Sequence, residues 1–320
     1  MAALVRRKLG PADVDELARR YRNWGTWGAD DELGAANYVT PDSVVRAAAE
    51  IRKGTVFSLA FPMDRSGPMT GGRGRVNPQH LMLRTGADIL ADPTETGDIR
   101  VTDDAVYMPL QSSTQWDALC HIIFRGEAYN GRGPDSVTSG GASHNSITNL
   151  KDRAVGRGVL LDVPRWLGRP WLEPGDVIQA EDLEACARHQ GVEPGEGDFL
   201  LVRTGHLALC RSEGHWGTYC GGTSPGLGLS AADFLCPRHV VGVATDTWGI
   251  EAIPYETEGI RAPLHVVLLV NAGVYIGEMW DLEALAEDCA ADGRWTFFLA
   301  APPLTITGSV GSPVNPLAIK

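Results

Sequence analysis

The feature that most restricts the fold of this chain is a recurring switch between short apolar runs and segments with helical spacing. The apolar runs are rich in β-branched residues and span residues 55–61, 158–163, 198–205, 240–247 and 266–277. The segments with helical spacing follow some of these runs and span residues 180–191, 230–236 and 281–293. The first pattern predicts buried strands and the second predicts amphipathic helices. We therefore expect an α/β fold with a mixed β-sheet core and covering helices.

Two further helices are predicted before the first strand. Apolar residues at helical spacing predict a helix over residues 11–24. A second helix is expected to begin after Thr40, which suits the N-cap and is followed by proline, and to stop at Gly54. No linker clearly divides the remaining chain. We therefore predict an N-terminal helical extension over residues 1–54 and a main unit over residues 55–320, which together form a single domain.

Three long connections are rich in glycine and proline but also contain aromatic and apolar residues. They span residues 62–80, 126–143 and 213–229. Disordered linkers contain few such apolar residues, so we interpret these connections as loops that cover a site.

Composition and charge exclude several classes of function. The 320 residues carry a formal net charge of -12. This charge argues against binding to nucleic acid or to an anionic membrane surface, since both require a basic footprint. No apolar run reaches the ~18 residues of a membrane span, the N-terminus lacks a signal-peptide pattern, and the six cysteines form no CxxC pair. We expect a cytoplasmic protein that acts on a small molecule.

The segment STQWDALCHI, residues 113–122, gathers side chains that can bind a metal or move a proton. If this segment and the residues before it form a strand, alternation places Gln111, Gln115 and Asp117 on one face. His121 follows four residues after Asp117 and can reach the same place if the chain turns there. A row of polar side chains is costly to bury without partners. This row therefore predicts either a reaction site or a solvated strand face.

Ionisable residues also stand at the ends of two apolar runs. His265 precedes the run of residues 266–277 and Glu278 follows it, so both ends of a buried strand would reach a polar cavity or the surface. The alternatives are a structural histidine and an acid at a helix N-terminus. Asp246 ends another run, where sites in α/β sheets tend to lie, although a turn-forming aspartate is the commoner role there.

These stretches resemble the metal-dependent cyclase/hydrolase family that includes bacterial kynurenine formamidase and isatin hydrolase. The family pattern is roughly H-x-x-x-H-x-D-x-P-x-H, followed later by a histidine and a glutamate that flank a buried strand. In QSSTQWDALCH and HVVLLVNAGVYIGE, the matching positions are Gln111, Gln115, Asp117, His121, His265 and Glu278. Leu119 stands where the family often has proline. The resemblance covers residues 55–320 and implies the swivelling β/β/α type of fold found in kynurenine formamidase.

The resemblance implies that Asp117, His265 and Glu278 bind a metal ion, with Glu278 also taking part in catalysis. It implies His121 as the residue that transfers protons. Gln115 stands at the position of a ligand histidine and is predicted here as a further metal ligand. A carboxamide oxygen is a weaker and harder donor than imidazole. It therefore suits hard ions such as manganese or magnesium better than softer metal ions. We therefore expect one divalent metal ion, manganese or zinc, or none at all.

The reaction implied is hydrolysis of an amide or lactone carbonyl in a small aromatic or cyclic molecule. Water activated by the metal would attack the carbonyl, with His121 as general acid and base. One alternative is a polyketide-type cyclase that uses acid/base chemistry with a weak metal or none. Another is a non-catalytic relative that binds a small molecule. The family also implies a homo-oligomer, either a dimer or a tetramer.

Overall fold

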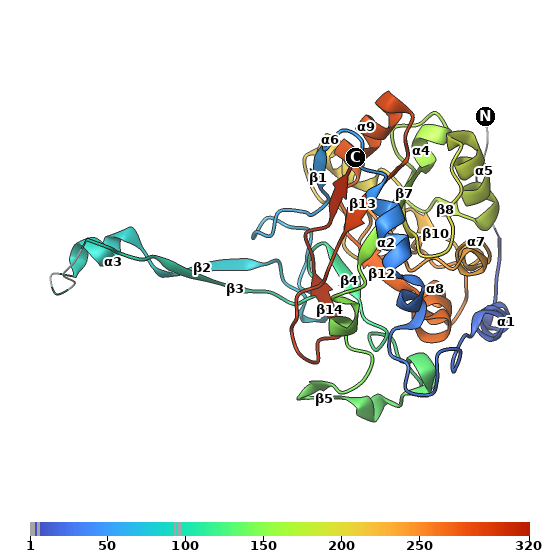
Figure 1. Ribbon diagram of the computed structural model, residues 1–320, viewed down its shortest axis with the longest axis horizontal. Coiled ribbons are helices and arrows are strands. Elements are labelled where there is room, and N and C mark those ends of the chain that lie inside the picture. Colours follow the sequence, from blue (N-terminus) through green and yellow to red (C-terminus); the bar gives the residue numbers. More distant parts are fainter. Residues whose placement is uncertain (1–3, 5–6, 93, 95–97) are drawn as a thin grey trace.

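The core of the protein is one large mixed sheet that curls through the body of the molecule (Figure 1). The computed structural model describes residues 4, 7–92, 94 and 98–320. In spatial order the nine strands are β1 (Val56–Ser58), β15 (Leu317–Ile319), β13 (Thr296–Ala300), β7 (Val155–Asp162), β9 (Phe199–Arg203), β11 (Gly242–Thr245), β12 (Tyr275–Glu278), β4 (Gln115–Asp117) and β14 (Gly311–Pro313). Strands β7, β9, β11 and β12 run parallel, and the neighbours on either side are antiparallel. The predicted α/β fold with a mixed sheet is confirmed.

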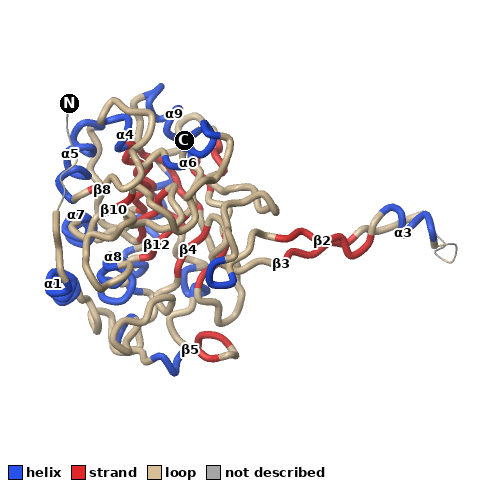
Figure 2. The backbone as a smooth tube through the Cα atoms, turned by 180° about the vertical axis from the view of Figure 1, so that it is seen from behind, coloured by secondary structure: helices blue, strands red, loops and turns tan. Residues whose placement is uncertain are grey.

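Helices cover the sheet on the side away from the long projection in Figures 1 and 2. They include α1 (Pro11–Tyr21), α4 (Val163–Trp166), α5 (Ala180–Gln190), α7 (Ala231–Leu235) and α8 (Pro263–His265). The remaining helices of the body are α2 (Pro41–Ala48), α6 (His206–Glu213) and α9 (Glu283–Asp292). Within the residues that the structure describes, none of these helices is long and apolar enough to cross a membrane.

The predicted helix boundaries hold where a capping residue sets them. Thr40 accepts a hydrogen bond from the backbone of Ser43 at 3.1 Å, which satisfies a free amide at the start of α2. Gly191 ends α5 in a left-handed conformation with φ 67°. Helix α2 ends at Ala48 and does not reach Gly54. The boundary at residue 54 between the N-terminal extension and the main unit stays a prediction. Residues 1–3 and 5–6 of that extension lie outside the described residues.

The apolar run of residues 266–277 was predicted as a single strand, and this prediction is wrong. Helix α8 continues into the π-helix η7 (Val266–Ala272), which ends at Gly273 with φ 61°. Only the last residues of the run form a strand, β12. Every residue of η7 is buried, and a helix buried on all sides is apolar all round. Periodicity therefore could not distinguish it from a buried strand.

A separate two-stranded sheet leaves the body as a long arm (Figure 2). In this arm, residues 79–107, strand β2 (Gln79–Arg84) pairs antiparallel with β3 (Asp103–Tyr107). Helix α3 (Gly86–Ala91) lies near its tip. The sequence patterns predicted no element between residues 81 and 105, because the strands are short and do not alternate cleanly between polar and apolar residues.

Candidate metal centre and active site

Strand β4 carries Gln115 and Asp117 onto one face of the sheet, beside Glu278 on β12. In the strand register Gln115 lies opposite Glu278, and Asp117 lies opposite Ile276. The amide of Gln115 donates a hydrogen bond to Glu278 Oε2 at 2.8 Å. Trp116 turns to the other face, where its indole N–H donates to the carbonyl of Ala301. The alternation predicted for residues 115–117 is therefore confirmed.

The prediction that the residues before Gln115 continue this strand is wrong. The backbone forms a turn, in which the amide of Ser112 donates to the carbonyl of Pro109 at 3.1 Å. Proline has no amide hydrogen for a strand ladder, which favours a turn at this point. Gln111 is buried under β14, where a Cβ added to Gly311 would lie 2.5 Å from its amide nitrogen. The two glutamines thus occupy different environments, although the motif places them together.

His265 approaches the two acidic side chains from the helix formed by α8 and η7. Its Nε2 lies 3.3 Å from Glu278 Oε1 and 3.8 Å from Asp117 Oδ2. One possible ligand atom from each of these three residues falls within 4.8 Å of the others. All three side chains are buried. The structure therefore brings together the three residues that the sequence resemblance implied as metal ligands, and they form a group that could hold a metal ion.

Glu251 holds the histidine of this group, although no sequence motif points to it. Its Oε1 accepts a hydrogen bond from the backbone amide of His265 at 2.7 Å and lies 2.9 Å from Nδ1. When Nδ1 donates to this carboxylate, the lone pair of Nε2 is left facing Asp117 and Glu278. Glu251 ends the stretch VGVATDTWGIE, but no spacing rule connects it to a helix that begins twelve residues later.

Several oxygens in this group are buried and accept no hydrogen bond from the described residues. They are Oδ1 and Oδ2 of Asp117, Oε1 of Gln115 and Oε2 of Glu251. A buried carboxylate without partners is costly. Burial and the nearby charge of Glu278 raise the pKa of Asp117 well above its ordinary value. A bound cation would supply the missing partner, so the residues present fit a metal ion.

The protonation of the two histidines follows from their surroundings. Burial lowers the pKa of His121 to about 4, so its imidazole is neutral at neutral pH. The chain turns at this point, and the backbone amide of His121 donates to the carbonyl of Ala118 at 2.9 Å. This turn places His121 Nε2 3.7 Å from Asp117 Oδ1. Burial acts to lower the pKa of His265, but the charges of Glu251 and Glu278 outweigh it and raise that pKa well above its ordinary value. His265 therefore favours its protonated form until a bound ion takes the place of the Nε2 proton, whereas His121 stays neutral.

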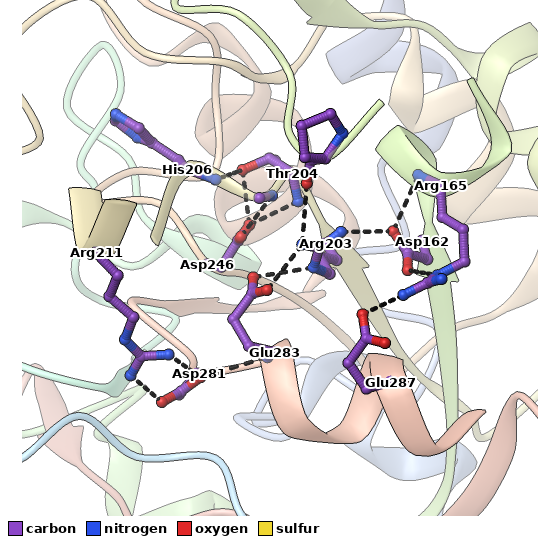
Figure 3. Close-up of polar contacts among 12 residues, drawn as sticks. Asp162, Arg165, Arg203, Thr204, His206, Arg211, Asp246, Asp281, Glu283 and Glu287 are labelled. Atoms are coloured by element: carbon purple, nitrogen blue, oxygen red, sulfur yellow. Dashed lines mark hydrogen bonds and ion pairs between the residues drawn. The ribbon is translucent and has the colours of Figure 1, made fainter. Parts of the chain in front are cut away.

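Asp246 belongs to a supporting network, and the expected local turn is not its role (Figure 3). Its carboxylate accepts hydrogen bonds at 2.7 Å from the amide and hydroxyl of Thr204 and from the amide of Gly205. In the same network Arg203 pairs with Asp162 and Glu283 at 2.9 and 2.8 Å. These contacts join the ends of β7, β9 and β11 beside the strand that carries Glu278.

The glycine-rich loop of residues 62–80 brings positive charge to the centre. The charge of Arg75 acts to lower the pKa of both Asp117 and His121, and Arg73 acts in the same direction on His121. The side chain of Asn77 secures this loop by bonding to the backbone of Gly67 and Met69.

Comparisons with known proteins give consistent results. A family described as "Putative cyclase" matches residues 34–252. A crystal structure of a novel cyclase is 42% identical, with a TM-score of 0.84 over 95% of this chain and 99% of that chain. Isatin hydrolase A from Labrenzia aggregata, solved with benzyl benzoate, is 20% identical, with a TM-score of 0.59 over 87% of this chain and 97% of that chain. A predicted metal-dependent hydrolase from Bacillus stearothermophilus is 22% identical, with a TM-score of 0.53 over 82% of this chain and 97% of that chain. No curated protein matches the sequence significantly.

Proposed function

The chain belongs to the putative cyclase family, and we propose that it is a metal-dependent hydrolase. It would cleave a C–N or lactone bond at the carbonyl of a small aromatic or cyclic molecule. The observation that carries this proposal is Asp117, whose two carboxylate oxygens are buried without a hydrogen-bond partner among the described residues. They lie next to His265 and Glu278 in a group that can hold a metal ion.

The donor atoms define the kind of metal that fits. Asp117 and Glu278 would offset the charge of a divalent ion, and His265 would bind it through Nε2. The unpartnered Oε1 of Gln115 would be the fourth donor. Three oxygen donors and one imidazole suit manganese, and zinc also accepts carboxylate and imidazole ligands.

When bound, the ion supplies Lewis-acid chemistry that polarises a carbonyl and makes water a better nucleophile. The side chains around it would move the protons. His121 would accept a proton from the attacking water at Nε2, because its neutral form dominates at neutral pH. It would then give that proton to the departing nitrogen or oxygen. Glu251 would keep the Nε2 lone pair of His265 directed at the ion.

An aromatic cluster beside the centre supports an aromatic or cyclic substrate. Met279, directly after Glu278, packs in an apolar cluster separate from the main core. The cluster comprises Phe61, Met69, Leu207, Cys210, Tyr219 and Met279, with Trp216, Cys220 and Trp248 packed against it. Small-molecule sites typically combine aromatic side chains with a few polar groups, which is why this cluster leads us to expect an aromatic or cyclic substrate.

Metal analysis tests the proposal without knowledge of the substrate. The protein is purified without chelator, incubated with Mn²⁺ or Zn²⁺, and its metal content is measured by elemental analysis. We expect one ion per chain in the wild type and its loss in Asp117→Asn. Asp182→Asn is the matched control, because Asp182 is also buried but lies at the start of α5. A wild type that binds neither ion would contradict metal-dependent hydrolysis.

A cyclase that works by acid/base chemistry is the second candidate. It is favoured by the contact between Gln115 and Glu278, because a protein amide already holds that carboxylate. A chain without metal whose melting temperature rises with aromatic compounds would support this reading, or that of a non-catalytic binding protein. Ring closure of a test substrate by the wild type, lost in His121→Ala, would separate these two.

A further inference from the structure

A cavity of about 560 Å³ lies between helix α1, the tight turn of residues 124–127 and the C-terminal end of η7. Its apolar wall includes the rings of Trp24 and Phe124, and its lining residues are distinct from those of the candidate metal centre. Figures 1 and 2 show α1 beside α8, from which η7 continues, on the side of the body away from the arm. Cavities of this size with aromatic walls and a few polar groups are typical of small-molecule sites.

Two arginines on this cavity have side-chain nitrogens that are free to bind a ligand. The guanidinium of Arg22 lies 4.1 Å from the centre of the Trp24 ring, and its Nε donates to Asn271 Oδ1 at 3.0 Å. Its two terminal nitrogens form no hydrogen bond or ion pair within the described part of the chain. Arg19, one helical turn earlier, pairs with no described residue. The Trp24 ring and Asn271 hold the guanidinium in place, and its planar fork matches a carboxylate.

Most of the other charged groups on the cavity are already paired. Arg125 pairs with Asp15 through two contacts, at 2.8 and 3.1 Å, and Glu16 pairs with Arg20 at 2.6 Å. Among the described residues, Glu127 is the acidic group on the cavity that lacks such a partner. Two unpaired arginines thus stand against one unpaired carboxylate, in a chain whose net charge is -12. This balance favours a ligand that carries a single negative charge.

The inner wall of the cavity leads directly to His265. Asn271 is buried, and its side-chain amide donates a hydrogen bond to the carbonyl of Val266 at 2.8 Å. Val266 follows His265 in the chain. Because Arg22 donates to the same asparagine side chain, two hydrogen bonds connect an exposed arginine with the residue next to His265.

The segment after α1 holds the C-terminal end of η7. Trp24 Nε1 donates to the carbonyl of Val270 at 2.7 Å, and the backbone amide of Asn23 donates to the carbonyl of Asn271 at 3.1 Å. The side-chain amide of Asn23 donates to the carbonyl of Ala272 at 2.8 Å. These bonds satisfy carbonyls that the last turn of a helix leaves free. A ligand that fixes this segment would therefore also fix the end of η7.

We propose that this cavity binds a small aromatic carboxylate, and that the bound ligand holds η7 and the turn of residues 124–127 in one arrangement. The carboxylate would bind the fork of Arg22, with Arg19 adding positive charge, and the aromatic ring would pack against the apolar wall. The turn begins three residues after His121, and η7 begins directly after His265. The ligand would thus steady both histidines from a distance. The binding site does not depend on the proposed function.

Isothermal titration calorimetry of the full chain with phenylacetate tests the site. We expect the wild type to bind phenylacetate at least about tenfold more tightly than the neutral analogue phenylacetamide, and Arg22→Gln to lose about tenfold or more in phenylacetate affinity, because a charged hydrogen-bond donor is removed. Arg19→Gln should show a smaller loss, and it leaves the contacts of η7 intact. Arg46→Gln is the matched control, because Arg46 is exposed on α2. No binding of phenylacetate, equal affinity for the amide, or unchanged affinity in Arg22→Gln would overturn the proposal.

A carboxylate could also bind at the candidate metal centre, and Asp117→Asn separates the two sites. We expect Asp117→Asn to bind phenylacetate as the wild type does. Binding that is lost in Asp117→Asn and kept in Arg22→Gln would place the ligand at the centre and overturn the proposal. If the protein binds no metal and the proposed function fails, phenylacetate binding should still depend on Arg22.

Hydrogen exchange measured by mass spectrometry tests the effect on η7. With saturating phenylacetate we expect exchange to slow about threefold or more in peptides that cover residues 266–272 and 124–127, because the ligand disfavours their local opening. The arm, residues 79–107, serves as the internal reference and should not change. In Arg22→Gln at the same phenylacetate concentration the protection should disappear. Equal exchange of residues 266–272 with and without phenylacetate would show that the ligand does not hold η7.

Discussion

Glu251 fixes the orientation of His265 through two contacts from a single carboxylate oxygen. Oε1 accepts the backbone amide of His265 at 2.7 Å and lies 2.9 Å from Nδ1. Both groups are buried, so water does not compete for these contacts. The ring is thereby held with Nε2 toward Asp117 and Glu278. A residue that touches no metal would thus determine how well its neighbour binds one.

Glu251→Gln should weaken metal binding about 10- to 100-fold, as loss of such partners does at other metal-binding histidines. The neutral amide oxygen of glutamine cannot accept hydrogen bonds from the backbone amide and Nδ1 of His265 as strongly as a carboxylate oxygen does. Competition with a chromogenic chelator measures the affinity for Mn²⁺ and Zn²⁺. Glu32→Gln is the matched control, because Glu32 also contacts a histidine, His144 Nδ1, at 2.6 Å. Unchanged affinity in Glu251→Gln would show that His265 needs no such support.

Asp117→Asn and His121→Ala should have separable effects. We expect Asp117→Asn to lose the metal, because it removes the anionic ligand whose oxygens lack other partners. His121→Ala should keep the metal and lose about 10²- to 10⁴-fold in turnover, the usual range for a general acid/base. Metal content and the hydrolysis rate of an amide or lactone accepted by the wild type measure these effects. Full turnover in both variants would refute the assigned roles.

Gln115→His should increase the affinity for zinc by about tenfold or more, because imidazole is a better zinc donor than a carboxamide. The side chain at this position already reaches Glu278. Gln111→His is the matched control, because Gln111 lies in the turn before β4 and packs against Gly311 of β14. Zinc titrations of both variants distinguish the two positions. A gain from Gln111→His equal to that from Gln115→His would mean that both glutamines lie at the centre.

The sequence motif was sufficient to predict which side chains the structure brings together, but not the residue that holds His265 in place. Asp117 and His121 stand in one motif, and His265 and Glu278 flank one apolar run, so position along the chain was informative. Glu251 acts on a histidine through a fold-level contact that no local pattern encodes. The segment after His265 is a buried helix, whose apolar composition is the same as that of a buried strand.

The arm was missed for another reason. Strand β2 contains three consecutive apolar residues, Leu81 to Leu83, between polar ones, and this sequence has no strand periodicity. Most side chains of β2 are exposed, so burial on one face does not impose an alternation on its sequence.

The C-terminal strand is held by a buried cation, which leads to a prediction about stability. Lys320 Nζ lies 2.8 Å from both Asp288 and Asp292 on α9 and is fully buried. Burial acts to raise the pKa of Asp292, but hydrogen bonds from Lys320 and Lys53 outweigh it and lower that pKa below its ordinary value of 3.8. Because the folded pKa is the lower one, the stabilisation is present above pH 3.8 and is lost as the pH falls through the folded pKa.

Lys320→Met should therefore lower the free energy of unfolding at pH 7 by about 1–3 kcal/mol, less than for a wholly buried pair because both carboxylates are partly exposed. The difference from the wild type should shrink as the pH falls below 3.8, because Asp292 then gains a proton in the unfolded chain while it stays ionised beside Lys320 in the folded one. Urea unfolding at pH 7 and at pH 3 measures both values. Lys53→Met is the control, and its effect should be smaller because Lys53 is 40% exposed. An equal loss from Lys320→Met at both pH values would mean that packing of the alkyl chain, and not charge, holds this strand.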